Sequence, residues 1–542
     1  MDSPFSQINS YLHKLPRSNG RLDSILIGRL VAAVLLLAAA IFLQLLPAFK
    51  IVLMLLSVLV AGYDLLLDLI DAVTNHDFLS APVVLLLIVA LSFLTSSGLE
   101  GAVCVILYQL GIVLINYAIG KTKQSAQDML DQADPDLRDR ASVIIDDENA
   151  GETELEHEIT GAASLILKIL MVLAVLFAVL MPIATSLSVR EAIRRAMVLL
   201  ALTLPISVVA SLPLSGIVGI AFASRFGVLF NNARVLEKLR LVKTAVIDKN
   251  GIFADSQPEF LGVKSDILDE NTFMEFVAHA VYYSDQAFAK AILAAQDREY
   301  RLDLISDFKD IPGSGVDVKI GGSEVTLAKR ELLTERGEAV PYEGKEGNSV
   351  YYLMVAGKYI GKVLVADHLN EQNTSLIGDL KTAGVERCIL LTEDSKDEGE
   401  RLGTSLNADE VYSEFTDETK LQYLESLDRS GTMYLYANSL QAHSNASLDV
   451  RVSKKGKYAD ALVCPDHLEL FPNMFGLSQR VREISVENVI FAFIIKAVLL
   501  FLALTGNCTV WFAIFLDFVA AIATVLNTIR VTKKPLIDLP KI

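Results

Sequence analysis

The chain has 542 residues, of which 52% are hydrophobic, and it carries a formal net charge of −17. So high an apolar fraction is rare in a soluble globular protein and indicates a membrane protein. The acidic balance argues against nucleic-acid binding, and the four cysteines form no CxxC pair, so we expect neither a disulfide framework nor a cysteine-ligated metal finger.

Long apolar runs gather in three blocks of the chain. They cover residues 25–46, 51–73, 81–94 and 101–119, then 165–183 and 196–223, and finally 489–504 and 510–526. A bilayer-spanning helix needs roughly 20 mainly apolar residues, so the runs predict about eight transmembrane helices in a lipid bilayer. Lysines and arginines before the first run, after the fourth and after the last place the soluble parts in the cytoplasm of a multi-pass plasma-membrane protein.

The runs divide the chain into alternating membrane and soluble parts. We expect a cytoplasmic segment at 1–24, helices 1–4 at 25–120, a short loop at 121–160, helices 5–6 at 161–223, a large insertion, helices 7–8 at 485–530 and a tail at 531–542. The short loop is acidic and too small to bury a core, so it is predicted to hold a helix and a loop. The large insertion, from about residue 224 to 487, is long enough for two compact domains.

Short apolar strands alternate with helical segments in the large insertion. The strands are TAVIDKN, RCILLTED, TMYLYAN and ADALVCP, and their alternation with helices is typical of a doubly wound parallel sheet. Residues 252–360 interrupt this pattern with a helix and two strand pairs of their own. We therefore predict an α/β domain at 224–251 and 361–484, with an α+β domain at 252–360 inserted into it.

The order of these parts resembles a heavy-metal-transporting P-type ATPase, and the zinc/cadmium branch in particular. The resemblance includes the stretches LEKLRLVKTAVIDKNG and LKTAGVERCILLTED and the two final helices, and it extends from about residue 27 to 531. It implies a haloacid-dehalogenase-like phosphorylation domain carrying a nucleotide-binding domain. It also implies ATP and Mg²⁺ as cofactors and a zinc-like divalent cation as the transported ion.

Asp248 stands at the family's phosphorylated aspartate. Asp248 and Lys249 match the DKTGT motif, whereas Asn250 and Ile252 replace its two threonines. A carboxylate at the end of a buried strand suits nucleophilic attack on a γ-phosphate, although a capping aspartate would also explain an isolated DKxG.

Other phosphate-site residues are partly retained. Thr392 matches the threonine of the TGD motif, but Glu393 replaces its glycine, and Lys420 falls where the family has a phosphate-facing lysine. Ala437 and Gln441 stand where two Mg²⁺-binding aspartates are expected, and an alanine side chain cannot ligate a metal ion. These changes predict that hydrolysis is lost.

The predicted nucleotide-binding domain is also altered. Gln286 and Ala287 replace a His-Pro pair, while Gly313 and Gly315 retain a GxG that would lie near the adenine and that is more often only a turn. The actuator domain, which the family carries between the fourth and fifth helices, does not fit into residues 121–160.

The membrane helices retain charges but lose thiols. Leu204 and Ile206 replace the metal-binding cysteines of the family's CPC motif. Lys496 and Asp517 each lie about ten residues from the turn at residues 506–507, so they are predicted to pair at the same depth. In the family the matching Asp ligates the metal with the Lys as counter-ion, and Glu100 also matches a family acid.

Three functions follow from this pattern. The first is a degenerate, non-hydrolysing pump that senses a ligand or regulates a partner such as another membrane protein or a related metal pump. The second is an active ATP-driven cation transporter with altered motifs. The third is a passive metal-binding or scaffold protein that uses only Lys496 and Asp517. Whether the chain is an enzyme stays open at this stage.

Overall fold

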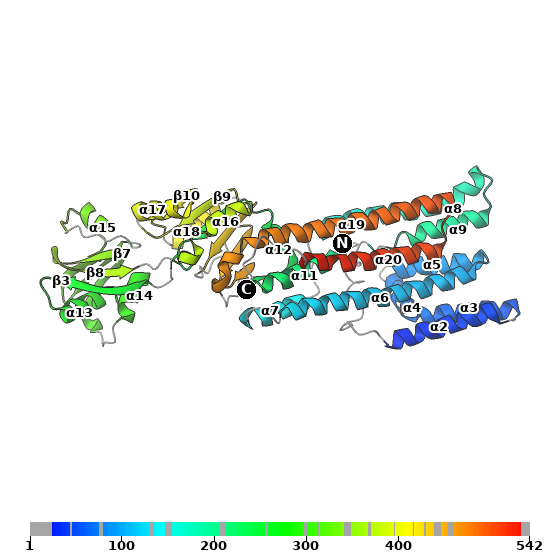
Figure 1. The fold of residues 1–542 in the computed structure, drawn as a ribbon, viewed down its shortest axis with the longest axis horizontal. Helices are drawn as coiled ribbons and strands as arrows, with labels where there is room; N and C mark the ends of the chain where they lie inside the picture. The colour runs from blue at the N-terminus through cyan, green and yellow to red at the C-terminus, as the bar shows by residue number, and fades with distance from the viewer. Residues whose placement is uncertain are drawn as a thin grey trace. The chain divides into compact units, whose positions relative to one another are not determined.

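The computed structural model describes residues 24–532 except for 44–45, 75–79, 131–134, 147–153, 205–206, 208–211, 255–257, 296–300, 312–313, 341–347, 367–369, 395, 416, 428–429, 438–445 and 454–458. The described residues form two compact units (Figure 1). The helical unit comprises Met1–Arg225, Phe230–Glu237 and Gly476–Ile542. The sheet unit comprises Phe226–Leu229 and Lys238–Phe475.

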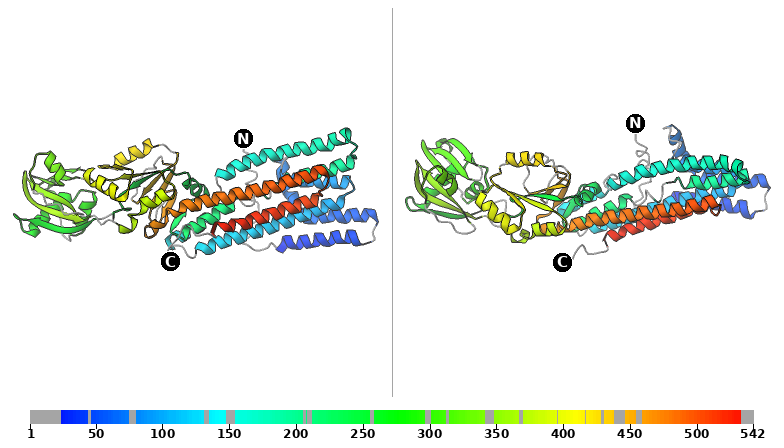
Figure 2. Two further views of the ribbon diagram at one scale, coloured as in Figure 1. Left: turned by 45° about the horizontal axis from the view of Figure 1, so that its top comes forward. Right: turned by 90° about the horizontal axis from the view of Figure 1, so that it is seen from above.

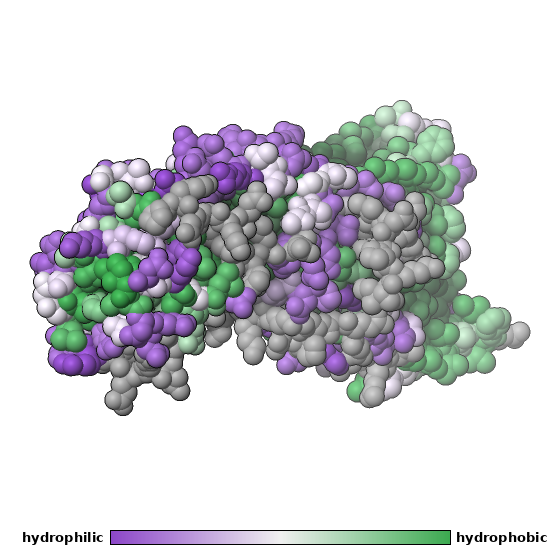
Figure 3. Space-filling view, turned by 60° about the vertical axis from the view of Figure 1, so that its left-hand side comes forward, coloured by the Kyte–Doolittle hydropathy of each residue, from purple (hydrophilic) through white to green (hydrophobic). Residues whose placement is uncertain are grey.

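The helical unit consists of helices, most of which are apolar. They are α2 (Ser24–Phe42), α3 (Pro47–Ala61), α4 (Tyr63–Thr74), α5 (Ala81–Leu94), α6 (Gly98–Leu130), α7 (Pro135–Asp146), α8 (Glu154–Ala184), α9 (Val189–Ala201), α11 (Leu212–Ser224), α19 (Asn473–Thr505) and α20 (Val510–Thr528). Much of the outer face of this unit that Figure 3 shows is hydrophobic, as expected of a surface in contact with lipid.

The predicted count of eight membrane spans is supported only in part. Among the described residues, four helices are long and apolar enough to cross a bilayer: Ser24–Phe42, Gly98–Leu130, Asn473–Thr505 and Val510–Thr532. A fifth span results if α3 and α4, which meet at 72°, are counted as one. Helices form at the other predicted runs, but their apolar parts are shorter, so the higher count stays a prediction.

Residues 121–160 contain more helix than expected. Helix α6 continues ten residues beyond residue 120 to Leu130, α7 follows, and α8 begins at Glu154, before the predicted fifth helix. The described part of the segment thus contains the predicted helix, α7, together with extensions of α6 and α8.

A seven-stranded sheet forms the larger part of the sheet unit. Its order is β1-β13-β12-β11-β2-β9-β10, and the pairs from β13 to β10 are parallel. The strands are β1 (Val228–Phe230), β2 (Thr244–Asp248), β9 (Arg387–Leu391), β10 (Glu410–Tyr412), β11 (Thr432–Tyr436), β12 (Leu448–Val452) and β13 (Ala461–Val463). The intervening helices include α16 (Leu376–Thr382), α17 (Lys396–Leu406) and α18 (Asp417–Ser426). All four predicted strands are present, so the parallel sheet is confirmed.

The inserted domain is a six-stranded antiparallel sheet with the order β3-β8-β7-β6-β5-β4. Its strands are β3 (Glu259–Ser265), β4 (Ile305–Ile311), β5 (Gly315–Ile320), β6 (Ser323–Ala328), β7 (Asn348–Val355) and β8 (Lys358–Ala366), with helices α13 (Glu270–Val281), α14 (Ala287–Ala294) and α15 (Arg330–Glu335). Phe273 and Val277 of α13 are buried in its core with Leu353 of β7. The expected boundary at residue 360 falls inside β8, so the insertion extends to Ala366.

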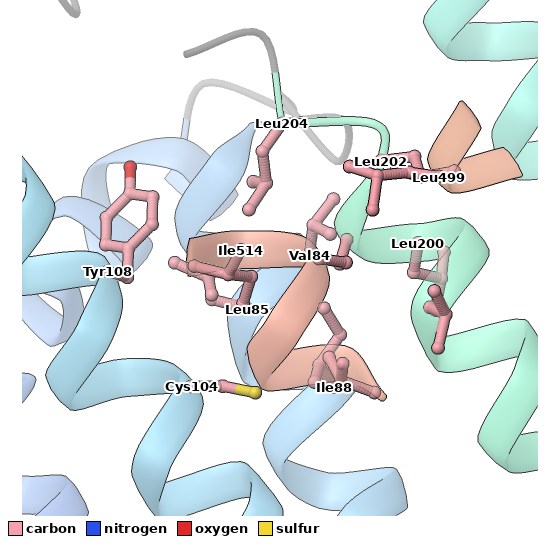
Figure 4. Close-up of a cluster of buried hydrophobic side chains, with 14 of the residues drawn as sticks. Val84, Leu85, Ile88, Cys104, Tyr108, Leu200, Leu202, Leu204, Leu499 and Ile514 are labelled. Carbon is pink, nitrogen blue, oxygen red and sulfur yellow. The ribbon is translucent and has the colours of Figure 1, made fainter. Parts of the chain in front are cut away.

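The core of the helical unit joins helices from all three apolar blocks. Leu85 of α5 and Tyr108 of α6 belong to one buried cluster with Leu499 of α19 and Ile514 of α20 (Figure 4). Helices α6 and α20 approach closely at Gly111, where a Cβ atom would lie 2.1 Å from the Phe518 ring. Small residues allow such close approach of membrane helices, which associate through packing.

This close approach predicts that Gly111→Ala destabilises the helical unit. The added methyl group forces Phe518 to move, and overpacking of this kind costs about 1–3 kcal/mol. We expect a lower thermal unfolding midpoint in detergent. Gly28→Ala in α2 is the matched control, because a Cβ atom there meets nothing within 4 Å. Equal midpoints for the two variants would contradict the predicted contact.

Candidate functional site

The carboxyl ends of three neighbouring strands meet at one edge of the parallel sheet. Asp248 is the last residue of β2, and it lies opposite Leu391, the last residue of β9. Thr392 follows directly, and Ala437 follows β11 on the other side of β2. Ligands of open α/β sheets bind at this edge, so the predicted phosphate-site residues are brought together by strand order alone.

Lys420 of α18 lies between two carboxylates. Its Nζ atom is 3.2 Å from Oδ2 of Asp248 and 3.0 Å from Oε1 of Glu393. The Lys420 side chain is 1% exposed, so its charge has to be compensated within the protein. The structure therefore brings together Asp248 and Lys420, as the sequence predicts, and it adds Glu393 as a second carboxylate on the same ammonium group.

A second charged pair lies beside the first. The Nζ atom of Lys249 donates to Oδ2 of Asp394 at 2.6 Å, and the hydroxyl group of Thr392 donates to the same oxygen at 2.9 Å. Thr392 is thus held by Asp394 and is fully buried. Lys329, which follows β6, lies 2.9 Å from Glu398 of α17 and was not anticipated from the sequence.

Burial and neighbouring charges act in opposite directions on the two aspartates. Burial raises the pKa of Asp248, and the Lys420 ammonium group offsets this only in part. Burial also acts on Asp394, but there the ammonium groups of Lys249 and Lys329 prevail and lower its pKa. The site thus favours an ionised Asp394 and disfavours an ionised Asp248.

The described residues at the sheet edge offer few free ligands for a Mg²⁺ ion. Ala437 has no donor atom in its side chain, and Gln441, the other expected position, lies outside the described residues. The Lys420 ammonium group contacts both nearby carboxylates, Asp248 and Glu393, so a fixed cation of the protein already compensates them. Hard divalent cations prefer several free carboxylate or carbonyl oxygens, which this arrangement does not provide.

Gln286 is held in place by hydrogen bonds within the inserted domain. The Nε2 atom of Gln286 donates to the Asp310 carboxylate and to the carbonyl groups of Ile311 and Gly315, the latter two both at 3.2 Å. Gly315 has φ of +146°, and a Cβ atom there would lie 2.2 Å from the Leu327 carbonyl oxygen. The backbone therefore requires this glycine whether or not a nucleotide binds, and Gly313 lies outside the described residues.

In the helical unit, Lys496 and Asp517 form the predicted ion pair. The Nζ atom of Lys496 is 3.0 Å from Oδ1 of Asp517, and both side chains are buried. Lys496 also donates to the carbonyl groups of Leu202 and Leu204 at 3.3 and 2.7 Å, where the chain leaves α9. The carbonyl groups freed at the helix end thus bind the lysine, whereas Ile206 lies outside the described residues.

Asp517 makes one further contact that sequence reasoning missed. The hydroxyl group of Ser207 donates to Oδ1 of Asp517 at 2.6 Å. The second carboxylate oxygen, Oδ2, is buried and has no hydrogen-bond partner among the described residues. Glu100 does not join this group: it pairs with Arg194 at 2.8 Å, at the start of α6. Asp517 and Glu100 therefore do not share partners, and metal binding by either residue stays a prediction.

Comparison with known proteins identifies relatives that are named as metal-transporting ATPases. The chain is 27% identical over 404 residues to a cadmium, zinc and cobalt-transporting ATPase of Bacillus subtilis, and the match covers 72% of this chain and 57% of that protein. It is 26% identical over 404 residues to a zinc-transporting ATPase of Synechocystis, with coverage of 72% and 56%. The chain thus spans little more than half the length of these relatives. No protein-family model matches it.

The fold comparison agrees. A crystal structure of a zinc-transporting PIB-type ATPase superposes with a TM-score of 0.57 at 16% identity, covering 94% of this chain and 100% of that one. A second crystal structure of such an ATPase, in another state, gives a TM-score of 0.52 at 17% identity. The sequence matches establish homology to heavy-metal P-type ATPases at about 26% identity, and the structures establish the fold.

The opposite pKa shifts predict opposite effects of two conservative substitutions. The raised pKa means that burying the Asp248 carboxylate costs folding free energy, and Glu393 still compensates Lys420 when that charge is removed, so Asp248→Asn should raise the thermal midpoint of the sheet unit at pH 7. The lowered pKa of Asp394 stabilises the fold at pH 7, so Asp394→Asn should lower the midpoint. That loss should shrink as the pH falls below about 4, where the carboxyl is protonated in the unfolded and then the folded chain.

The full chain in detergent serves for this measurement, with Cys104 and Cys508 replaced by alanine. The buried Cys388 of β9 and Cys464, which follows β13, then report unfolding when they react with 4,4′-dithiodipyridine, which also reacts with thiols at acid pH. If both variants shift the thermal midpoint by the same amount in the same direction, the pKa values of Asp248 and Asp394 are not shifted in opposite directions.

The ion pair in the helical unit predicts strong coupling between its partners. Lys496→Met leaves the Asp517 carboxylate buried without its counter-ion, and breaking a buried pair costs about 3–5 kcal/mol. The double variant Lys496→Met/Asp517→Leu should recover much of this loss in thermal stability. If the losses of the two single variants simply add, a double-mutant cycle would show no coupling and the pair would contribute nothing.

Proposed function

We propose that this chain is a heavy-metal P-type ATPase relative that no longer hydrolyses ATP and acts as a regulatory or sensing membrane protein. The proposal rests on the ammonium group of Lys420, which contacts the carboxylates of both Asp248 and Glu393. In a working site, this lysine would face a phosphoryl group beside the aspartate nucleophile. Here the Glu393 carboxylate lies 3.0 Å from it, so the chain's own negative charge takes the place of the incoming one.

The metal side of the site supports the same proposal. Phosphoryl transfer from ATP depends on Mg²⁺ to neutralise charge between nucleophile and phosphate, and loss of that ion removes several kcal/mol of transition-state stabilisation. Ala437 offers no ligand, and the Asp248 carboxylate is occupied by Lys420. We therefore expect a rate loss of about 10³-fold or more relative to an intact site.

The relatives suggest the class of ligand. The homologous proteins are named as transporters of zinc, cadmium and cobalt, so a soft divalent cation is the natural ligand for a sensing role. The candidate ligand in the helical unit is Asp517, because its Oδ2 atom is buried and has no hydrogen-bond partner among the described residues. Carboxylate and hydroxyl oxygens from Asp517 and Ser207, without thiolates, would bind such a cation weakly.

Passive cation binding is the second candidate function, and the unpartnered Oδ2 atom of Asp517 favours it. It differs from the first only in that no partner protein responds to occupancy. A partner that co-purifies with the chain and is released by Zn²⁺ supports the regulatory proposal. Zn²⁺ binding that Asp517→Ala abolishes, without any partner, supports passive binding instead.

The proposal predicts that no phosphoenzyme forms. Purified protein incubated with Mg²⁺ and γ-³²P-ATP should retain no acid-stable label, because the lysine and carboxylates of the site already neutralise one another. Asp248→Asn gives the background level. Label in the wild type that disappears in Asp248→Asn would show that Asp248 still accepts a phosphoryl group from ATP, as an active pump requires, and would overturn the proposal.

A further inference from the structure

Buried polar side chains form a continuous row in the helical unit, which we call the polar seam. It consists of Ser207, Ser215, Ser485, Asn488, Lys496, Asp517, Thr524, Asn527 and Thr528. Eight of these nine residues are buried, and Asn527 is partly buried. They belong to α11 and the segment before it, to α19 and to α20. Most other residues of these helices are apolar.

Helical periodicity places the polar residues on facing sides. Ser485 and Lys496 are eleven residues apart in α19, which is about three turns, so they share one face and lie roughly 16 Å apart along the axis. In α20, Asp517 and Thr528 have the same separation, and Thr524 lies between them on the same face. Figures 1 and 2 show α19 and α20 running side by side.

Hydrogen bonds between side chains connect the helices along the whole length of the polar seam. At one end Ser207 and Lys496 bind Asp517. Further along, Asn527 donates to Asn488 at 2.9 Å, and the hydroxyl groups of Ser215 and Ser485 are 2.5 Å apart. The Lys496 and Asn488 contacts join α19 to α20 and the Ser485 contact joins α19 to α11. In contrast, Thr524 and Thr528 donate to backbone carbonyl groups of their own helix.

Two atoms of the polar seam lack a protein partner. Oδ2 of Asp517 and Nδ2 of Asn488 are both buried, and neither has a hydrogen bond among the described residues. Leaving such a group unsatisfied costs about 1–3 kcal/mol, so buried polar atoms almost always bind protein or water. The two atoms lie in successive layers of the polar seam, and Ala492, a small buried residue, lies one turn from both Asn488 and Lys496 in α19.

An exposed pair of charges lies beside the Ser485 end of the polar seam. Just beyond Asn488 and Asn527, Arg530 forms an ion pair with Glu487 at 2.7 Å, and both side chains are more than half exposed, at 55% and 52%. Polar residues inside membrane bundles are costly and mark water-filled or ion-conducting routes, although they also serve as hydrogen-bonding contacts between helices.

We propose that the polar seam holds a chain of water molecules that connects the Asp517 carboxylate to the solvent at the Glu487–Arg530 end of the helices. The water satisfies the free atoms of Asp517 and Asn488 and gives the buried ion pair access to protons from that side. This route does not depend on ATP hydrolysis, so it stands or falls separately from the proposed function.

Cysteine labelling tests the proposal on the full chain in liposomes, with all four native cysteines replaced by alanine. Thr524→Cys places a thiol in the polar seam, and Val519→Cys places one on the same helix at a position that is 44% exposed on the lipid-facing surface. A thiol ionises and reacts with a charged, membrane-impermeant thiosulfonate only where water reaches it. We expect Thr524→Cys to react at least about tenfold faster than Val519→Cys.

A second substitution tests the route. Asn488→Leu in the Thr524→Cys background should slow labelling to the rate of the Val519→Cys control, because an apolar side chain interrupts the water chain. If labelling of Thr524→Cys is as slow as that of the control, the polar seam is dry and only joins the helices. If Asn488→Leu leaves the fast rate unchanged, water does not pass Asn488 and the proposed route is wrong. Ala492→Cys, which lies one turn deeper than Asn488 in α19, replaces Thr524→Cys if the latter is not monodisperse.

Discussion

Compensation of buried lysine charges within the chain is the constraint on which both sites of this protein depend. At the sheet edge, the ammonium group of Lys420 is held by Asp248 and Glu393. Among the membrane helices, the ammonium group of Lys496 is held by Asp517 and by two backbone carbonyl groups. Each cation would otherwise be too costly to bury. At the sheet edge, therefore, the protein itself supplies the negative charge that a phosphate would bring, and in the helical unit Lys496 supplies the positive charge that a bound cation would bring to Asp517.

Under the proposed function, the sheet edge keeps the geometry of a phosphoryl-transfer site while its chemistry is changed. Strand order still brings Asp248 and Thr392 together, because the carboxyl ends of adjacent parallel strands lie at one edge. A glutamate at position 393 and an alanine at 437 change only side chains, so the fold tolerates them. A scaffold of this kind can keep its shape after its activity is lost, since fold and function are separable.

Much of the fold could be predicted from the sequence, because strong signals act locally. The apolar strands β2, β9, β11 and β13 follow from local hydrophobicity. The equal depth of Lys496 and Asp517 follows from the constant rise per residue of two helices that are joined by one turn. In contrast, β12 alternates apolar and polar residues over only five positions and gives a weak signal.

The site could be predicted less completely, because its decisive contacts join residues that are distant in sequence. The pairing of Glu393 with Lys420 and that of Lys329 with Glu398 depend on how loops fold back over the sheet edge. Neutral residues such as Ser207 and Asn488 create no charge that demands a partner, so the sequence does not reveal the polar seam. The pKa difference between Asp248 and Asp394 likewise depends on burial, which motif comparison does not supply.

Binding of beryllofluoride, a phosphoryl mimic, tests the central claim most directly. Fluorine NMR of the full chain with Mg²⁺ and BeF₃⁻ should show no bound signal, because Glu393 already neutralises Lys420 and the Mg²⁺ ligand at position 437 is missing. The variant Glu393→Gly/Ala437→Asp should gain a bound signal. A bound signal in the wild-type protein that is lost in Lys420→Met would contradict the account, since it would show that the sheet edge still accepts a phosphoryl group.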